Sequence, residues 1–116
     1  MKKEFSRLKN TVLGRQYELS LVFIDQKRSR ELNKKYRRKN KPTNVLSFPL
    51  SNKVGEIFID LDTATKDAKK FGMSFREFVK YLFIHGLLHL KGMRHGATME
   101  TTEKKLLNGT SNRSRY

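Results

Sequence analysis

The stretch His85-Gly-Leu-Leu-His89-Leu-Lys-Gly92-Met-Arg-His95 contains all three histidines of this 116-residue chain. His85 and His89 are four residues apart, so on a helix they lie on one face, about one turn from each other. Gly92 can take the left-handed conformation that ends a helix, which lets the chain turn back and bring up His95. Three imidazole nitrogens that leave one position open are typical of a catalytic zinc site. The spacing therefore predicts a metal site on these three histidines.

The order of histidines and glycine in this stretch is that of the metzincin proteases, with one difference. In those enzymes the residue after the first histidine is the Glu that acts as general base. This chain has Gly86 at that position. Such a protease needs the carboxylate to activate its water. The motif therefore predicts the metal ligands of a metzincin protease in a protein that catalyses a different reaction.

The charge of the chain indicates an anionic partner. Lys and Arg number 26 against 11 acidic residues, which gives a formal net charge of +15. Repulsion among so many positive charges destabilises the folded chain, and proteins usually tolerate it in order to bind a polyanion. We therefore expect a nucleic acid as the partner. The alternatives are binding to acidic lipid and a basic surface without a specific partner. The chain has no cysteine, which fits a reducing cytosol and excludes thiolate ligands. No apolar stretch approaches about 18 residues and the N-terminus does not resemble a signal sequence, so we expect a cytoplasmic protein without a membrane partner.

Hydrophobic periodicity and capping signals predict one domain over residues 1–107 and a disordered basic tail over residues 108–116. Ser74 and Glu77 form a capping box, and the helix that follows them is apolar nearly all round. That helix should be buried at the centre of the domain and should carry His85 and His89 to the edge of a cleft. Asp60 or Asp62 is the expected cap of the preceding helix. The expected helices span residues 1–13, 26–37, about 60–71, 74–90 and 98–107, and the expected strands span residues 17–24, 43–49 (stopped by Pro49) and 55–60.

Nine basic residues lie between positions 27 and 41: Lys27, Arg28, Arg30, Lys34, Lys35, Arg37, Arg38, Lys39 and Lys41. The first part of this run is typical of a solvated helix face or of diffuse contact with phosphates. The segment 36–42 is different, because we expect it in a loop between a helix and a strand, where functional groups are often displayed. An arginine there can bind phosphate oxygens with both arms of its guanidinium.

Three blocks together resemble the YbeY family of bacterial endoribonucleases, which act in ribosomal RNA maturation. They are Tyr36-Arg-Arg-Lys-Asn-Lys-Pro-Thr-Asn-Val-Leu-Ser-Phe-Pro49, Gly55-Glu-Ile-Phe-Ile59 and the three-histidine stretch, and the likeness covers roughly residues 17–107. The resemblance implies an α/β (α+β) domain with a small mixed sheet flanked by helices. It also implies one zinc or other divalent ion on the histidines, and cleavage of single-stranded RNA with Arg37 as the catalytic residue. Arg37, Arg38, Lys39 and Lys41 are the expected RNA-binding residues.

The chain departs from the family pattern at two places. The family usually has Tyr-Asp before the last histidine, where this chain has Met93-Arg94. If that aspartate normally accepts hydrogen bonds near the metal, Arg94 cannot replace it, because arginine only donates. The N-terminus also looks short, as if the family's first strand were missing.

The leading hypothesis is therefore a metal-dependent endoribonuclease that processes ribosomal RNA, including 16S rRNA, and acts in ribosome quality control. Its partners would be single-stranded RNA and the ribosome or ribosomal proteins, and no DNA is expected. Glu56 is a candidate general base if its strand borders the cleft. The alternatives are a non-catalytic ribosome-assembly factor braced by its metal, a metzincin-like protease that lacks its base, and a purely structural histidine cluster.

Overall fold

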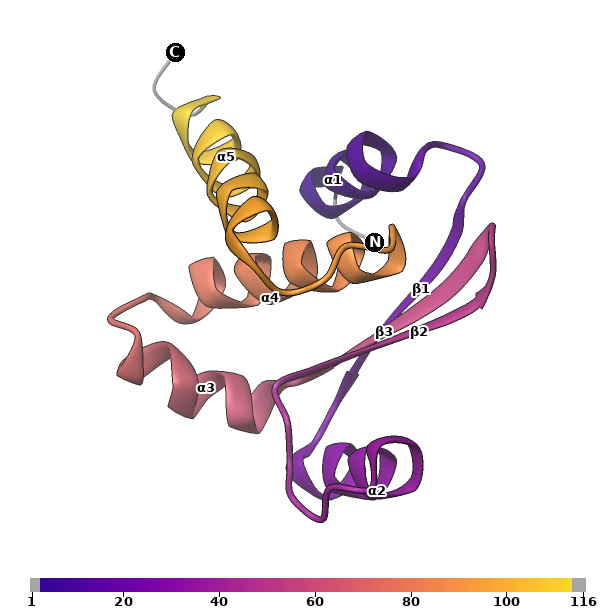
Figure 1. Cartoon of the computed structure of the whole chain (residues 1–116). Helices are drawn as coiled ribbons and strands as arrows, with labels where there is room; N and C mark the ends of the chain where they lie inside the picture. Colours follow the sequence, from indigo (N-terminus) through magenta and orange to yellow (C-terminus); the bar gives the residue numbers. More distant parts are fainter. Residues whose placement is uncertain (1–2, 114–116) are drawn as a thin grey trace.

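The computed structural model describes the backbone of residues 3–113 and has a small sheet with helices on both faces (Figure 1). The strands form one mixed sheet in the order β1-β3-β2, with β1 parallel and β2 antiparallel to β3. This confirms the expected fold class, a small mixed sheet flanked by helices. In chain order the elements are α1 (Lys3–Leu13), β1 (Glu18–Ile24), α2 (Gln26–Arg37), β2 (Val45–Ser51), β3 (Val54–Asp60), α3 (Leu61–Lys70), α4 (Phe75–Leu90) and α5 (Ala97–Arg113).

Different helices cover the two faces of the sheet. Ile57 of β3 is fully buried on the side of α4. Side chains alternate along a strand, so Phe58 lies on the other face, where its ring meets Phe48 edge-on. Tyr36 of α2 packs against Phe48 on that same face. The sheet therefore separates α2 from α4, as Figure 1 shows.

Helix α4 is the central helix that the sequence predicts. Ser74 caps it by accepting a 3.2 Å hydrogen bond from the N–H of Glu77. Its apolar residues are buried from several directions, because α4 contacts β2 and β3 below it and α1, α3 and α5 around it. Phe83, Ile84 and Leu87 are completely buried. The core is thus built around the helix that carries two of the histidines.

Two element boundaries differ from the expectations, and the structure decides between the two expected caps of α3. The strand expected to stop at Pro49 continues to Ser51, because a proline on an edge strand can direct its missing N–H away from the ladder. Asp60, not Asp62, caps α3 by accepting from the N–H of Thr63. Helix α5 runs to Arg113, so residues 108–113 are helical and not part of a disordered tail; residues 114–116 lie outside the described range. Each residue added to an existing helix gains a hydrogen bond, so a polar stretch can prolong it.

No helix within residues 3–113 combines the length and the apolar character that a membrane crossing needs.

Candidate metal centre

The three histidines come from two parts of the chain and meet at one point. His85 and His89 lie on the last turns of α4, and His95 lies in the turn before α5. Their ring centroids are 4.6, 4.7 and 5.0 Å apart. One nitrogen of each ring lies within 4.8 Å of the other two. His95 is exposed, so the cluster opens to the surface, and the structure brings together all three ligands expected from the spacing.

Gly92 turns the chain back toward the histidines. Its φ is +101°, and its N–H donates to the carbonyl of His89 at 2.9 Å. The N–H of Met93 donates to the carbonyl of Leu88 at 2.9 Å. This pair of bonds is the Schellman motif, in which the left-handed position favours glycine. No atom lies within 4 Å of a Cβ added at Gly92, so it is the positive φ that calls for glycine here.

Glu103 of α5 holds the ring of His85 from its other side. Its carboxylate contacts Nδ1 of His85, and Glu103 is only 5% exposed. Because a carboxylate accepts, we assign the proton to Nδ1, which leaves the lone pair of Nε2 directed toward the other histidines. Carboxylates commonly orient metal-binding histidines in this way. The sequence did not lead us to predict a role for Glu103. The signal that could have indicated it is its place on the last helix, four residues after Met99 and therefore on the same buried face.

The donor set fits a divalent metal ion. Two nitrogens that share a tetrahedral zinc at about 2.0–2.1 Å are roughly 3.3 Å apart. The Nε2 atoms of His85 and His89 are 3.1 Å apart. Burial lowers the pKa of His89, and the charges of His85, His95 and Arg37 lower it further, against a raising contribution from the Met93 backbone. His89 is thus held in the neutral form that binds metal.

Arg37 and its neighbours lie at the C-terminus of α2. The positive charge of Arg37 contributes to the lowered pKa of His89. Arg38 then ends α2 with φ +59°, a left-handed conformation that costs a non-glycine residue roughly 1–2 kcal/mol. The buried Asn33 fixes the loop, because its amide donates to the carbonyl of Lys41 at 2.8 Å. The side chains of Arg37, Arg38, Lys39 and Lys41 are all exposed.

Glu56 and Arg94 make no described contact with the histidines, although Arg94 directly precedes His95 in the chain. Glu56 precedes Ile57 on β3 and therefore lies on the α2 face of the sheet, opposite the helix that carries the histidines. Arg94 is exposed in the turn between His89 and His95, and within the described range it makes no hydrogen bond to either. Their expected roles as general base and metal-site neighbour stay predictions.

Gly86 is the position at which a metzincin protease has its glutamate. A Cβ added there would lie 2.9 Å from Cδ1 of Ile57 and 3.0 Å from Oγ of Ser47. Position 86 therefore faces β2 and β3, and a side chain would enter the sheet. Glycine here allows α4 to pack closely on the sheet, which argues against a protease-like base at this position.

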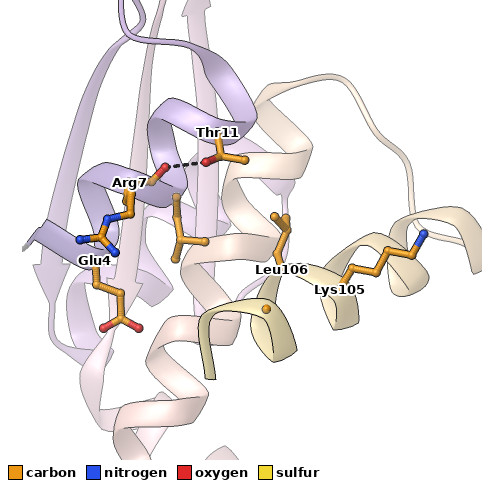
Figure 2. Close-up of a pocket in the computed structure, with 7 residues that line it drawn as sticks. Glu4, Arg7, Thr11, Lys105 and Leu106 are labelled. Carbon is orange, nitrogen blue, oxygen red and sulfur yellow. Dashed lines mark hydrogen bonds between the residues drawn. The ribbon is translucent and has the colours of Figure 1, made fainter. Parts of the chain in front are cut away.

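Two hollows among the described residues lie away from the histidines. One, of about 210 Å³, is between α1 and α5 (Figure 2), with Thr11, Arg7, Glu4, Lys105 and Leu106 on its walls. The other, of about 850 Å³, is bordered by Phe5 of α1, Phe75 of α4 and Leu19, Leu21 and Phe23 of β1. The three histidines line neither of these two hollows.

Comparison with known proteins agrees with this arrangement. The family model described as Endoribonuclease YbeY matches residues 2–113. Two proteins named Endoribonuclease YbeY are similar to this chain. The one from Aquifex aeolicus is 43% identical over 93 residues, covering 75% of this chain and 62% of its own length. The one from a Campylobacter jejuni strain is 40% identical over 98 residues, covering 78% of this chain and 73% of its own length.

A solved structure supports the fold alone. The solution structure of TM1509 from Thermotoga maritima superposes with a TM-score of 0.70 at 24% identity, covering 97% of this chain and 80% of that one. The chain spans less than two thirds of the length of the Aquifex relative. The family model, in contrast, matches almost the whole chain. This chain belongs to the YbeY family.

Proposed function

We propose that this chain is a metal-dependent endoribonuclease, a hydrolase that cleaves single-stranded RNA. The observation that carries the proposal is the convergence of three histidine nitrogens within 4.8 Å of one another. The contribution of the Arg37 charge to the lowered pKa of His89 supports it. Relatives 36–44% identical to this chain carry the name endoribonuclease, and the charge of +15 suits an RNA substrate.

In this proposal the histidines, Arg37 and the basic loop each have a separate role in hydrolysis. His85, His89 and His95 would hold one divalent ion, zinc being the ion that this all-nitrogen set favours, although other divalent metals also bind such sites. When bound, the ion supplies a Lewis acid for a phosphoryl oxygen or for water. Arg37 binds the scissile phosphate and offsets the negative charge that develops on it. Arg38, Lys39 and Lys41 draw in and hold the RNA backbone.

We further propose that the enzyme works in the cytoplasm on ribosomal RNA, in 16S rRNA processing and ribosome quality control, with the ribosome or ribosomal proteins as partners and without acting on DNA. A polyanionic substrate fits the basic surface, and a chain without cysteine suits a reducing compartment.

A non-catalytic RNA-binding assembly factor is the second candidate. It is favoured by the positions of two carboxylates, because Glu56 lies on the far face of the sheet and Glu103 is buried against His85. If neither acts as general base, a catalytic site would do without a protein carboxylate or use the 2′-hydroxyl of the RNA. In the assembly-factor alternative the metal only braces the fold.

A matched nuclease assay separates the two. Wild type, Arg37→Ala and His89→Ala are purified identically and given a labelled RNA with one single-stranded and one duplex region. Bound metal is quantified by elemental analysis. We expect cleavage of the single strand only, with about one zinc per wild-type chain. Arg37→Ala should keep its metal and lose roughly 100- to 1000-fold in rate, as when one group that stabilises transition-state charge is removed.

His89→Ala should lose both the metal and the cleavage. Equal cleavage by all three proteins would reveal a contaminating nuclease and refute the proposal. RNA binding without cleavage by any of them would favour the assembly factor.

A further inference from the structure

Tyr36 is a large aromatic side chain held at the surface. It is 56% exposed, although it is one of the last residues of α2. One side of its ring packs against Phe48 of β2, with centroids 5.1 Å apart and an angle of 57° between the planes. Phe48 in turn meets Phe58 edge-on at 5.8 Å. Phe48 therefore supports the Tyr36 ring on one side, while more than half of the residue stays exposed.

The surroundings of this ring are strongly basic. Nζ of the exposed Lys35 lies over the Tyr36 ring, 5.3 Å from its centroid, and Arg37 is the next residue. Within the described range, none of the nine basic residues between positions 27 and 41 forms an ion pair with a carboxylate. An exposed ring within uncompensated positive charge suits a ligand that combines a flat apolar surface with phosphates, which is the chemistry of a nucleotide chain. An acidic peptide would satisfy the charges without using the ring.

The edge strand β2 connects the Tyr36 ring to the helix that carries two of the histidines. Phe48, which supports Tyr36, follows Ser47 on β2. Oγ of Ser47 donates to the carbonyl of Gly86 at 3.3 Å, in the same turn of α4 as His85. Successive residues of a strand point to opposite faces, so Tyr36 and the histidine helix border the same short segment of β2 from its two sides. An RNA strand bound across β2 would have the Tyr36 ring on one side of this segment and the histidine helix on the other.

We propose that Tyr36 is a base-stacking site, on which an unpaired base of the RNA lies while the adjoining phosphate is bound at Arg37. This inference rests on the proposed function and deepens it, because a stacked base must be free of its pairing partner. Stacking on Tyr36 therefore gives the site a physical reason to prefer single-stranded over duplex RNA.

The test compares two probes and four proteins. The probes are a labelled single-stranded RNA and a ribose-phosphate strand of the same length without bases. The proteins, all loaded with zinc, are wild type, Tyr36→Ala, Tyr36→Phe and Phe71→Ala. Phe71 is the control because it is also exposed, at 68%, and also stacked on a buried ring, that of Phe78, but it follows α3. Fluorescence anisotropy gives the Kd values, and a gel confirms that each probe stays intact.

We expect Tyr36→Ala to raise the Kd for RNA by about 5- to 100-fold, the range for the loss of one base–aromatic contact. Its Kd for the strand without bases should equal that of wild type. Tyr36→Phe and Phe71→Ala should bind both probes as wild type does. Wild-type affinity for RNA in Tyr36→Ala, or an equal loss on both probes, overturns the inference while the nuclease assay can still support the proposed function. Failure of wild type to bind RNA overturns both.

Discussion

Two buried carboxylates each fix one half of the candidate site, and they do so differently. Asp60 is completely buried at the end of β3, where it caps α3 through Thr63 and accepts a 2.6 Å hydrogen bond from Ser29 of α2. Glu103 of α5 contacts His85 alone among the described hydrogen bonds. Asp60 therefore joins three elements and sets the position of the basic helix, whereas Glu103 orients one histidine of the candidate metal centre. The comparison indicates that one carboxylate links several elements of the fold, while the other acts on a single side chain.

Asp60→Ala should have the largest effect on stability. It removes a helix cap, which contributes about 1 kcal/mol, and hydrogen bonds to a buried charge, which contribute about 1.5–3 kcal/mol each. We expect the free energy of unfolding, measured with urea, to fall by roughly 3–5 kcal/mol.

Asp62→Ala is the matched control for this change. Asp62 is exposed and accepts one bond, from the N–H of Gln26 at 3.1 Å, so its loss should cost only about 0.5 kcal/mol. Equal losses in the two variants would show that Asp60 is an ordinary cap and not the junction of three elements.

Glu103→Gln should weaken metal binding more than it weakens the fold. The amide can still accept from Nδ1 of His85, but it lacks the charge that makes the ring a better donor to a metal. We expect zinc affinity, measured by competition with a chromophoric chelator, to fall by about 10- to 100-fold. Glu100→Gln, on the exposed face of the same helix, should leave the affinity unchanged. Wild-type affinity in Glu103→Gln would mean that α5 contributes packing only.

What the sequence could predict depends on how far apart the interacting residues lie along the chain. The cap at Asp60, the capping box at Ser74 and the turn at Gly92 depend on residues a few positions apart, so spacing alone identified them or narrowed the choice to two. The three histidines lie within eleven residues and were likewise readable. Glu103 lies 18 positions after His85, and only the packing of α5 against α4 brings the two together. No local pattern distinguishes such a glutamate from a surface residue.

The alternation of side chains along the strand could also be predicted from the sequence. Which face of the sheet Glu56 would share with the helices could not. The sequence places Glu56 and Phe58 on one face of their strand, and the structure agrees. The face of β3 that carries Ile57 meets the histidine helix, because Gly86 has no side chain and lets Ile57 approach α4. A bulkier residue at either position would prevent that contact, and the sequence does not show the two positions as neighbours.

Lys39→Ala should have the smallest effect, and it tests whether the basic loop acts at a defined place. Lys39 is exposed in the loop that Asn33 ties down. If its ammonium neutralises one phosphate, the slope of log Kd against log salt concentration for single-stranded RNA should fall by about 0.7, with a few-fold loss of affinity and unchanged metal content. Lys70→Ala is the control, because Lys70 is also highly exposed but lies on α3. An equal change of slope in Lys70→Ala would mean that the total charge holds the RNA, and the basic loop would then have no special place in the site.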